Sequence, residues 1–104
     1  GGESLEQVLE RVKKYFDISK SGMQLIVRGR LPGDRIRPLG LGGSKKVQDL
    51  LVDAKTSSNQ RNRVPIVCAP WGIIWVVGNC IDEQVAIKPT TKQVLHMKFH
   101  QIND

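Results

Sequence analysis

Nine basic side chains are concentrated in one part of this sequence, residues 28–63. Only three acidic residues lie in the same segment, so its excess of positive charge equals the net charge of the whole chain, +6. The segments on either side contain equal numbers of acidic and basic residues. Guanidinium and ammonium groups gathered in this way are typical of a surface that contacts the phosphates of a polyanion. A merely solvated charged face is the alternative.

The arginines of this segment are spaced as in a β-hairpin. Residues 23–30 alternate as a strand, Pro32-Gly33 suits the centre of a type II turn, and residues 35–37 suit a return strand. With that turn, Arg30 faces Arg35, and Arg28 faces Arg37. Facing like charges cost roughly 0.2–1 kcal/mol per pair, so an anionic ligand is the simplest explanation. The predicted clamp consists of Arg28, Arg30, Arg35 and Arg37 on one side of the hairpin.

A glycine-rich segment follows, and it predicts a second phosphate contact. Ser44 suits the N-cap of a helix that runs to about Lys55, with Val47, Leu50, Leu51 and Ala54 as its buried stripe. Backbone N–H groups beside a helix start suit a phosphate, although no Walker motif is present. A structural turn and a mononucleotide site stay open as alternatives. The predicted site comprises Gly42, Gly43, Ser44, Lys45 and Lys46.

Arg61 and Arg63 complete the set of candidate nucleic-acid contacts. A short helical turn is expected over residues 59–63. Contacts to phosphate and structural ion pairs with Asp49 or Asp53 are equally open for these arginines.

The aromatic residues favour recognition of a nucleic-acid backbone over stacking on bases. Trp71 lies at an expected turn, where it could stack on a base, whereas Trp75 lies in an apolar run and is expected to be buried. None of the five aromatic residues is interleaved with the arginines. We therefore expect contacts to the backbone of a folded or duplex nucleic acid.

No catalytic or metal-binding constellation is apparent. His96 and His100 lie in an expected strand, about 13 Å apart and too far for one ion. Cys68 and Cys80 lack a zinc spacing and are expected to be a buried, reduced pair. The adjacent Asp82 and Glu83 would face opposite sides of a strand. We expect no catalytic residue, no metal and no cofactor in this domain.

The elements expected to carry these residues define a small α+β domain. A capping box at Ser4 and an apolar stripe predict a helix over residues 4–17, and strands are expected over 66–69, 73–77, 84–87 and 94–99. The fold expected is a mixed or antiparallel sheet of short strands, one central helix and an N-terminal helix. Residues 1–22 are expected to be that helix and a linker, an appendage to a domain of residues 23–104; Gly1-Gly2 are set aside.

We expect a cytoplasmic protein, in keeping with reduced cysteines, and the hydropathy pattern predicts that it does not enter a membrane. Its longest uninterrupted apolar run covers residues 73–77, far shorter than the roughly 20 residues of a membrane span. The first residues do not have the pattern of a signal peptide.

Residues 25–87 resemble the C-terminal domain of tRNA(Ile)-lysidine synthetases. The resemblance is carried by residues 27–40, with Leu31-Pro32-Gly33-Asp34 at their centre, and by residues 43–46, 53–55, 61–65, 74–78 and 81–83. It covers about 60 of the 104 residues in unbroken order, and the expected leading helix lies outside it. One departure is Gln84, where the family usually has arginine.

The resemblance implies a role in tRNA modification. The family's enzymes use ATP to join lysine to the wobble cytidine of an isoleucine tRNA, and their chemistry, with ATP and Mg²⁺, belongs to an N-terminal catalytic domain. The C-terminal domain binds tRNA, chiefly at the acceptor stem, and is similar to a module of the phenylalanyl-tRNA synthetase β chain. The expected partners are thus tRNA and the parent catalytic domain. The alternative is a protein-interaction module that docks an acidic partner or that catalytic domain through the apolar region around Trp71.

Overall fold

The computed structural model describes residues 12–19 and 24–100, and its centre is an antiparallel hairpin of apolar strands. β5 (Ile66–Ala69) and β6 (Gly72–Val76) pair around the Pro70-Trp71 turn. β2 (Ile26–Arg28) joins the outer side of β5, and β7 (Cys80–Ile81) joins β6, giving the order β2-β5-β6-β7. The bounds of β5 agree with the sequence prediction, because an apolar run between turn residues is a strong local signal.

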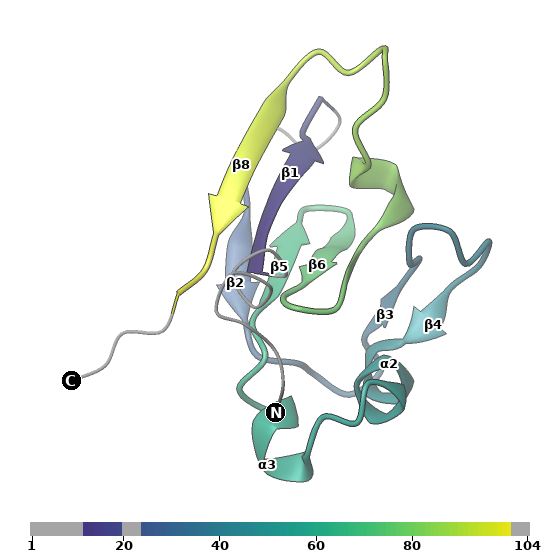
Figure 1. The fold of residues 1–104 in the computed structure, drawn as a ribbon, viewed down its shortest axis with the longest axis vertical. Coiled ribbons are helices and arrows are strands. Elements are labelled where there is room, and N and C mark those ends of the chain that lie inside the picture. Colours follow the sequence, from purple (N-terminus) through teal and green to yellow (C-terminus); the bar gives the residue numbers. More distant parts are fainter. Residues whose placement is uncertain (1–11, 20–23, 101–104) are drawn as a thin grey trace, which may run out of the picture.

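Two smaller layers cover the opposite faces of this sheet (Figure 1). One consists of β1 (Lys13–Asp17) and β8 (Val94–Lys98), paired antiparallel. The other consists of β3 (Arg35–Ile36), β4 (Lys45–Lys46) and α2 (Val47–Asp53). α3 (Ser58–Arg61) leads from α2 back to β5, and the 3₁₀ helix η1 (Glu83–Val85) follows β7. The predicted α+β class is therefore confirmed.

The described residues form two hydrophobic core clusters, one on each face of the central sheet. Phe16, Val67 and Ile74 pack around Trp75 beneath β1 and β8. Ile36, Leu51 and Ile66 belong to the second cluster, beneath β3 and α2. Because both faces are covered, every residue of β5 is buried, and so are the last four of β6.

The helix expected over residues 4–17 is wrong for residues 13–17, which form β1. This strand exposes Tyr15 and buries Phe16, and each residue has a partner across β8, where Phe16 faces Leu95. An apolar stripe alone could not reveal a partner about 80 residues away in the chain. Residues 4–11 and the proposed linker at 20–23 lie outside the described residues, so the division into residues 1–22 and 23–104 stays a prediction.

Three further expectations need correction. The strand expected over residues 84–87 does not form: residues 83–85 are η1, because the Asp82 side chain accepts the Gln84 N–H at 2.8 Å and caps a helical turn. The central helix begins at Val47 rather than after Ser44 and ends at Asp53, so Ala54 lies exposed beyond it. The return strand at Arg35 pairs with β4, and β2 pairs with β5.

Candidate nucleic-acid interface

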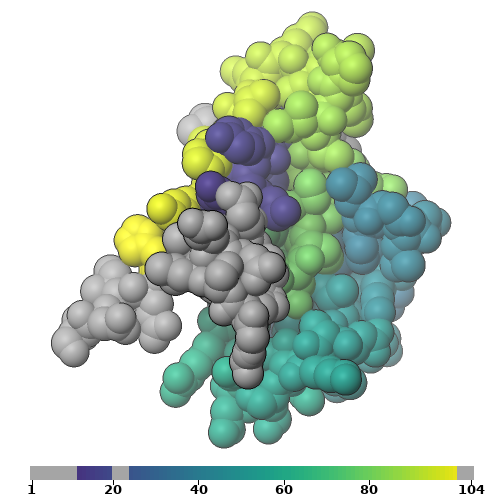
Figure 2. Space-filling model, in the orientation of Figure 1, coloured from purple at the N-terminus to yellow at the C-terminus, as the bar shows by residue number. Residues whose placement is uncertain are grey.

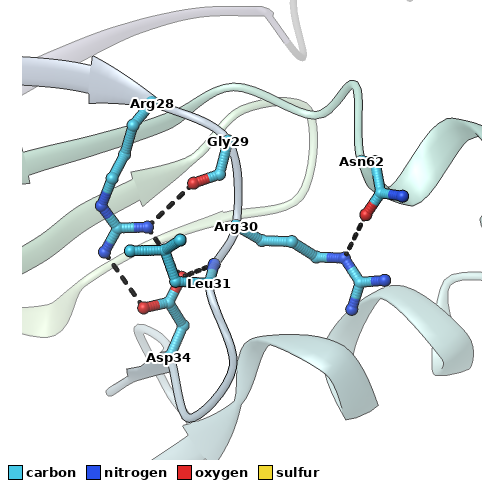
Figure 3. A network of polar contacts seen from close by, with 6 residues as sticks. All are labelled: Arg28, Gly29, Arg30, Leu31, Asp34 and Asn62. Atoms are coloured by element: carbon cyan, nitrogen blue, oxygen red, sulfur yellow. Dashed lines mark hydrogen bonds and ion pairs between the residues drawn. The ribbon is translucent and has the colours of Figure 1, made fainter.

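Arg28 stabilises the turn at Pro32-Gly33 through the carboxylate of Asp34 (Figure 3). Its Nη1 and Nη2 donate to Asp34 Oδ2 and Oδ1 at 2.8 and 3.0 Å, and the Leu31 N–H donates to Oδ2 at 2.7 Å. Gly33 has φ +85°, as the predicted type II turn requires. Partial burial opposes ionisation, but the bonds from Arg28 and Leu31 prevail and lower the pKa of Asp34 from its ordinary 3.8.

Arg30 is oriented by an uncharged side chain. Its Nε donates to Asn62 Oδ1 at 3.1 Å, across to the residue that ends α3. Among the described residues, no hydrogen bond engages its two terminal nitrogens, and Figure 3 shows them pointing away from Asn62. The amide fixes the guanidinium without reducing its charge.

Arg35 is held in the same manner, by the hydroxyl of Ser44. Its Nε and Nη2 donate to Ser44 Oγ at 3.2 and 3.0 Å. In the pairing of β3 with β4, Arg35 lies directly opposite Lys46. Facing like charges destabilise a sheet. The pairing of Arg35 with Lys46 therefore favours an anionic ligand, as the predicted pairing of Arg30 with Arg35 did.

Arg37, in contrast, is engaged by a carboxylate. Its Nε donates to Glu83 Oε1 at 2.7 Å. This bond and the negative charge of Glu83 raise the pKa of Arg37, with a smaller contribution from the charge of Asp82. The predicted clamp is therefore wrong as a geometry: Arg28 faces Ile66 and not Arg37, Arg30 lies outside β2, and the four guanidinium groups bond to four different partners.

The predicted phosphate site at the helix start is also rearranged. Gly42, with φ +80°, and Gly43 lie in the loop between β3 and β4, so they do not adjoin α2. Ser44 binds Arg35 and caps no helix; the N-cap residue is Lys46, which makes no capping bond with its side chain. Lys45 pairs with the carboxylate of Asp53 at the other end of α2.

Arg61 and Arg63 have no ion pair with Asp49 or Asp53 within the described residues. Arg61 Nε donates to the Thr56 carbonyl at 3.0 Å, and Asp53 is engaged by Lys45. Both arginines flank Asn62 in the sequence, the residue that accepts the Arg30 Nε–H. The short helix expected here is confirmed as α3.

Six of the nine basic residues in segment 28–63 therefore lack a carboxylate partner within the described part of the chain. We call them the uncompensated cations. In Figure 2 the segment that contains them, coloured blue to teal, occupies the right-hand and lower parts of the molecule. The uncompensated cations are Arg30, Arg35, Lys46, Lys55, Arg61 and Arg63.

A concave surface lined by two of these cations lies between the Pro32-Gly33 turn and the start of α2. It has a volume of about 400 Å³, and Arg30, Lys46, Gln48 and Asn62 contribute to its lining. The turn and α2 are joined by a bond from the Val47 N–H to the Asp34 carbonyl at 2.9 Å. Asn62 and Gln48 were not identified as candidates from the sequence. Nothing in the local sequence indicates that Asn62 contacts a side chain 32 positions earlier.

The remaining candidates have structural surroundings. Trp75 is fully buried as predicted, and Trp71 is half-buried against the same cluster. Both cysteines are free thiols, Cys68 buried and Cys80 half-buried. Burial, with a smaller contribution from Asp82, raises the pKa of Cys80 to about 11, and burial also raises that of Cys68. Both thiols therefore stay protonated at neutral pH.

Residues 12–19 and 24–100 contain no set of three His, Cys, Asp or Glu side chains placed to hold a metal ion. No helix in this part of the chain has the length and apolar character needed to cross a membrane.

The fold and this surface define a small α+β domain with a cationic surface over segment 28–63. Within that class, the chain belongs to the TilS substrate C-terminal domain family, whose model matches residues 25–98. A solved structure described as a TilS C-terminal domain superposes with a TM-score of 0.70 at 27% identity, covering 88% of this chain and 73% of that one. The family expected from the sequence is confirmed.

Several bacterial relatives carry the name tRNA(Ile)-lysidine synthase. Those of Clostridium acetobutylicum and Clostridium tetani are 34% and 40% identical over 88 and 86 residues, which is 85% and 83% of this chain. That of Symbiobacterium thermophilum is 52% identical over 70 residues, 67% of this chain. The matched regions are 19%, 18% and 14% of those proteins, so the chain spans less than a fifth of their length.

Proposed function

We propose that this domain binds tRNA on behalf of a tRNA(Ile)-lysidine synthase, through contacts to backbone phosphates of the acceptor stem. The observation that carries the proposal is the set of six uncompensated cations within one segment. Family membership supports the same function independently of charge. Phosphate contacts fix the position of a nucleic acid without reading its sequence, which suits a domain that orients tRNA.

The chemistry is assigned to the part of such enzymes that this chain does not match. There, lysine would be joined to the wobble cytidine with ATP and Mg²⁺. The proposed role of this domain is to hold one end of the tRNA while the anticodon loop meets the catalytic domain.

Salt dependence of tRNA binding tests the proposal. Each phosphate neutralised contributes about −0.7 to −0.9 to the slope of log affinity against log salt, so five or six contacts give roughly −3.5 to −5.4. We expect this slope when fluorescently labelled tRNA is titrated with the domain at several NaCl concentrations and binding is followed by anisotropy. Affinity independent of salt would refute the proposal.

A pair of charge-matched variants shows where the tRNA binds. Arg30→Ala/Arg35→Ala removes two uncompensated cations, and we expect it to reduce the salt slope by about two units. Lys88→Ala/Lys92→Ala removes the same charge from the loop between η1 and β8, far from α2 and α3 in Figure 1, and should leave the slope unchanged. Equal losses from both variants would mean that only the net charge matters.

A second candidate function is docking onto the parent catalytic domain. Ile26 and Val27 are 62% and 55% exposed on β2, an edge strand of the central sheet. Ile26 lines one concavity with Trp71, the apolar region that the sequence singled out. This function predicts a complex with a synthase catalytic domain that survives about 0.5 M salt, where exposed charges are largely screened. The Ile26→Asp variant should lose that complex and still bind tRNA.

A further inference from the structure

The concavity between the Pro32-Gly33 turn and the start of α2 brings together residues from three parts of the chain. Its volume, about 400 Å³, lies within the range of small-ligand sites. The Val47–Asp34 backbone bond joins two of its walls, and the Arg30–Asn62 bond joins the third. Its polar lining consists of Arg30, Asp34, Lys46, Gln48 and Asn62.

The charges of this lining do not cancel. The carboxylate of Asp34 already accepts two bonds from Arg28 and one from Leu31. Arg28 therefore offsets the one acidic group that the described residues contribute to the lining. Arg30 and Lys46 keep their positive charges, because neither is bonded to a carboxylate among the described residues.

Asn62 prepares the Arg30 guanidinium for a bidentate contact. It occupies Nε and leaves the two terminal nitrogens for another acceptor, as Figure 3 shows. The planar fork of arginine matches two oxygens of a phosphate, and fixing it beforehand reduces the conformational entropy lost on binding. An aspartate at position 62 would orient the same group but neutralise it.

We propose that this concavity binds one phosphate group of a polynucleotide, with Arg30 and Lys46 as its charged ligands and Asn62 as the positioning residue of Arg30. The inference rests on the proposed function and adds to it a defined site. An internal phosphodiester and a terminal 5′-monophosphate share the chemistry required.

A double-mutant cycle on tRNA affinity tests the role of Asn62. Arg30→Ala should weaken binding about tenfold, the lower end for a hydrogen bond to a charged group. Asn62→Ala should weaken it about threefold, typical of coupled neighbours. In the Arg30→Ala background, Asn62→Ala should have no further effect. Additive losses would overturn the positioning role.

The Asn62→Asp variant separates positioning from structural support. It should lower tRNA affinity more than Asn62→Ala, because the new carboxylate neutralises Arg30, yet it should unfold at the same or a higher urea concentration. The Asn59→Asp variant changes the charge equally on exposed α3 and is the control. If affinity and stability fall together in Asn62→Asp, or if Asn59→Asp weakens binding equally, the proposal is wrong.

A titration with inorganic phosphate tests the site without tRNA. We expect NMR signals of the Arg30 Nε–H and of the Asn62 and Gln48 side-chain amides to shift in the wild type, and the two amide signals not to shift in Arg30→Ala. Unshifted signals in the wild type would overturn the site even if tRNA binds with a steep salt slope. If phosphate binds and tRNA does not, the proposed function fails instead.

Removing the 5′-phosphate from the tRNA distinguishes the two sources of phosphate. If the threefold effect of Asn62→Ala disappears with dephosphorylated tRNA, the occupant is the terminal monophosphate. If the effect persists, the occupant is an internal phosphodiester. Either result supports the site, whereas no effect of Asn62→Ala on either tRNA refutes it.

Discussion

The central hairpin of β5 and β6 and the basic segment 28–63 are built in opposite ways. The hairpin consists of consecutive apolar residues covered on both faces, and its backbone pairs within the central sheet. The basic segment contains two-residue strands and a seven-residue helix, and side-chain bonds such as Arg30–Asn62 and Lys45–Asp53 join its parts. The hairpin stabilises the fold through apolar burial, whereas the polar side chains of the basic segment hold its charged groups in position.

Two kinds of arginine within the basic segment make the same contrast. Arg28 and Arg37 bond to carboxylates, so their charges are offset locally. Arg30 and Arg35 bond to an amide and a hydroxyl, which restrain a guanidinium without neutralising it. We therefore propose that the partner of an arginine, and not its position in the sequence, distinguishes a structural role from a role in binding tRNA.

The largest expected effect is on the hairpin side. Trp75 has no exposed surface and contacts the rings of Phe16 and Phe99 at centroid distances of 5.1 and 5.3 Å. Trp75→Ala should lower the free energy of unfolding by about 3–5 kcal/mol, because it leaves a cavity in the core cluster that contains Phe16, Val67 and Ile74. Urea unfolding followed by circular dichroism measures this loss.

Trp75→Phe is the matched control. The indole Nε1 has no hydrogen-bond partner among the described residues, so phenylalanine removes an unsatisfied donor and keeps an aromatic ring. We expect a loss of about 1 kcal/mol, far smaller than for alanine. Equal losses from both substitutions would show that the indole nitrogen matters more than packing.

A smaller effect on the free energy of unfolding is expected at Asp34, whose carboxylate binds Arg28 in the basic segment. Asp34→Asn should reduce stability at pH 7 by about 1 kcal/mol, because the charge-assisted bonds from Arg28 weaken. The pKa of Asp34 is lowered in the folded state, so its contribution is complete well above pH 3.8 and is lost as the pH falls through the folded value.

Urea unfolding of wild type and variant at several pH values measures this difference. The difference in the free energy of unfolding between wild type and Asp34→Asn should be largest at pH 7 and should disappear at acidic pH. Asp49→Asn, at an exposed position of α2 with no described partner, should show no such gap. A gap that stays constant down to low pH would show that Asp34 acts through its shape and not its charge.

Much of the hairpin side could be predicted from the sequence. The run 66–69 is β5, 73–77 differs from β6 by one residue at each end, and 94–99 extends one residue beyond β8. Apolar runs bounded by turn residues are local signals, and burial follows directly from them. The Pro32-Gly33 turn was predictable for the same reason.

The pairing of the basic segment was not predictable from local pattern. The turn suggested that residues 35–37 return along residues 28–30, but Ile36 is 2% exposed and belongs to the core cluster with Val47 and Leu51. Because Ile36 is buried in this cluster, β3 pairs with β4 and not with β2. The charge excess was visible in the sequence, yet the partners Asn62, Ser44 and Glu83 depend on that tertiary packing.

The smallest expected effect tests whether the partner determines the role of an arginine. Glu83→Gln replaces the carboxylate that engages Arg37 with a neutral amide, making Arg37 resemble Arg30 and Arg35. If Arg37 then reaches phosphate, tRNA affinity should rise about twofold, the equilibrium cost of breaking an exposed ion pair, and the salt slope should steepen by up to about one unit. The control is Glu83→Gln in an Arg37→Ala background, where no gain is expected. A gain of equal size in that background would mean that Glu83 acts on tRNA through its long-range field, and the distinction between the two kinds of arginine would not hold at this site.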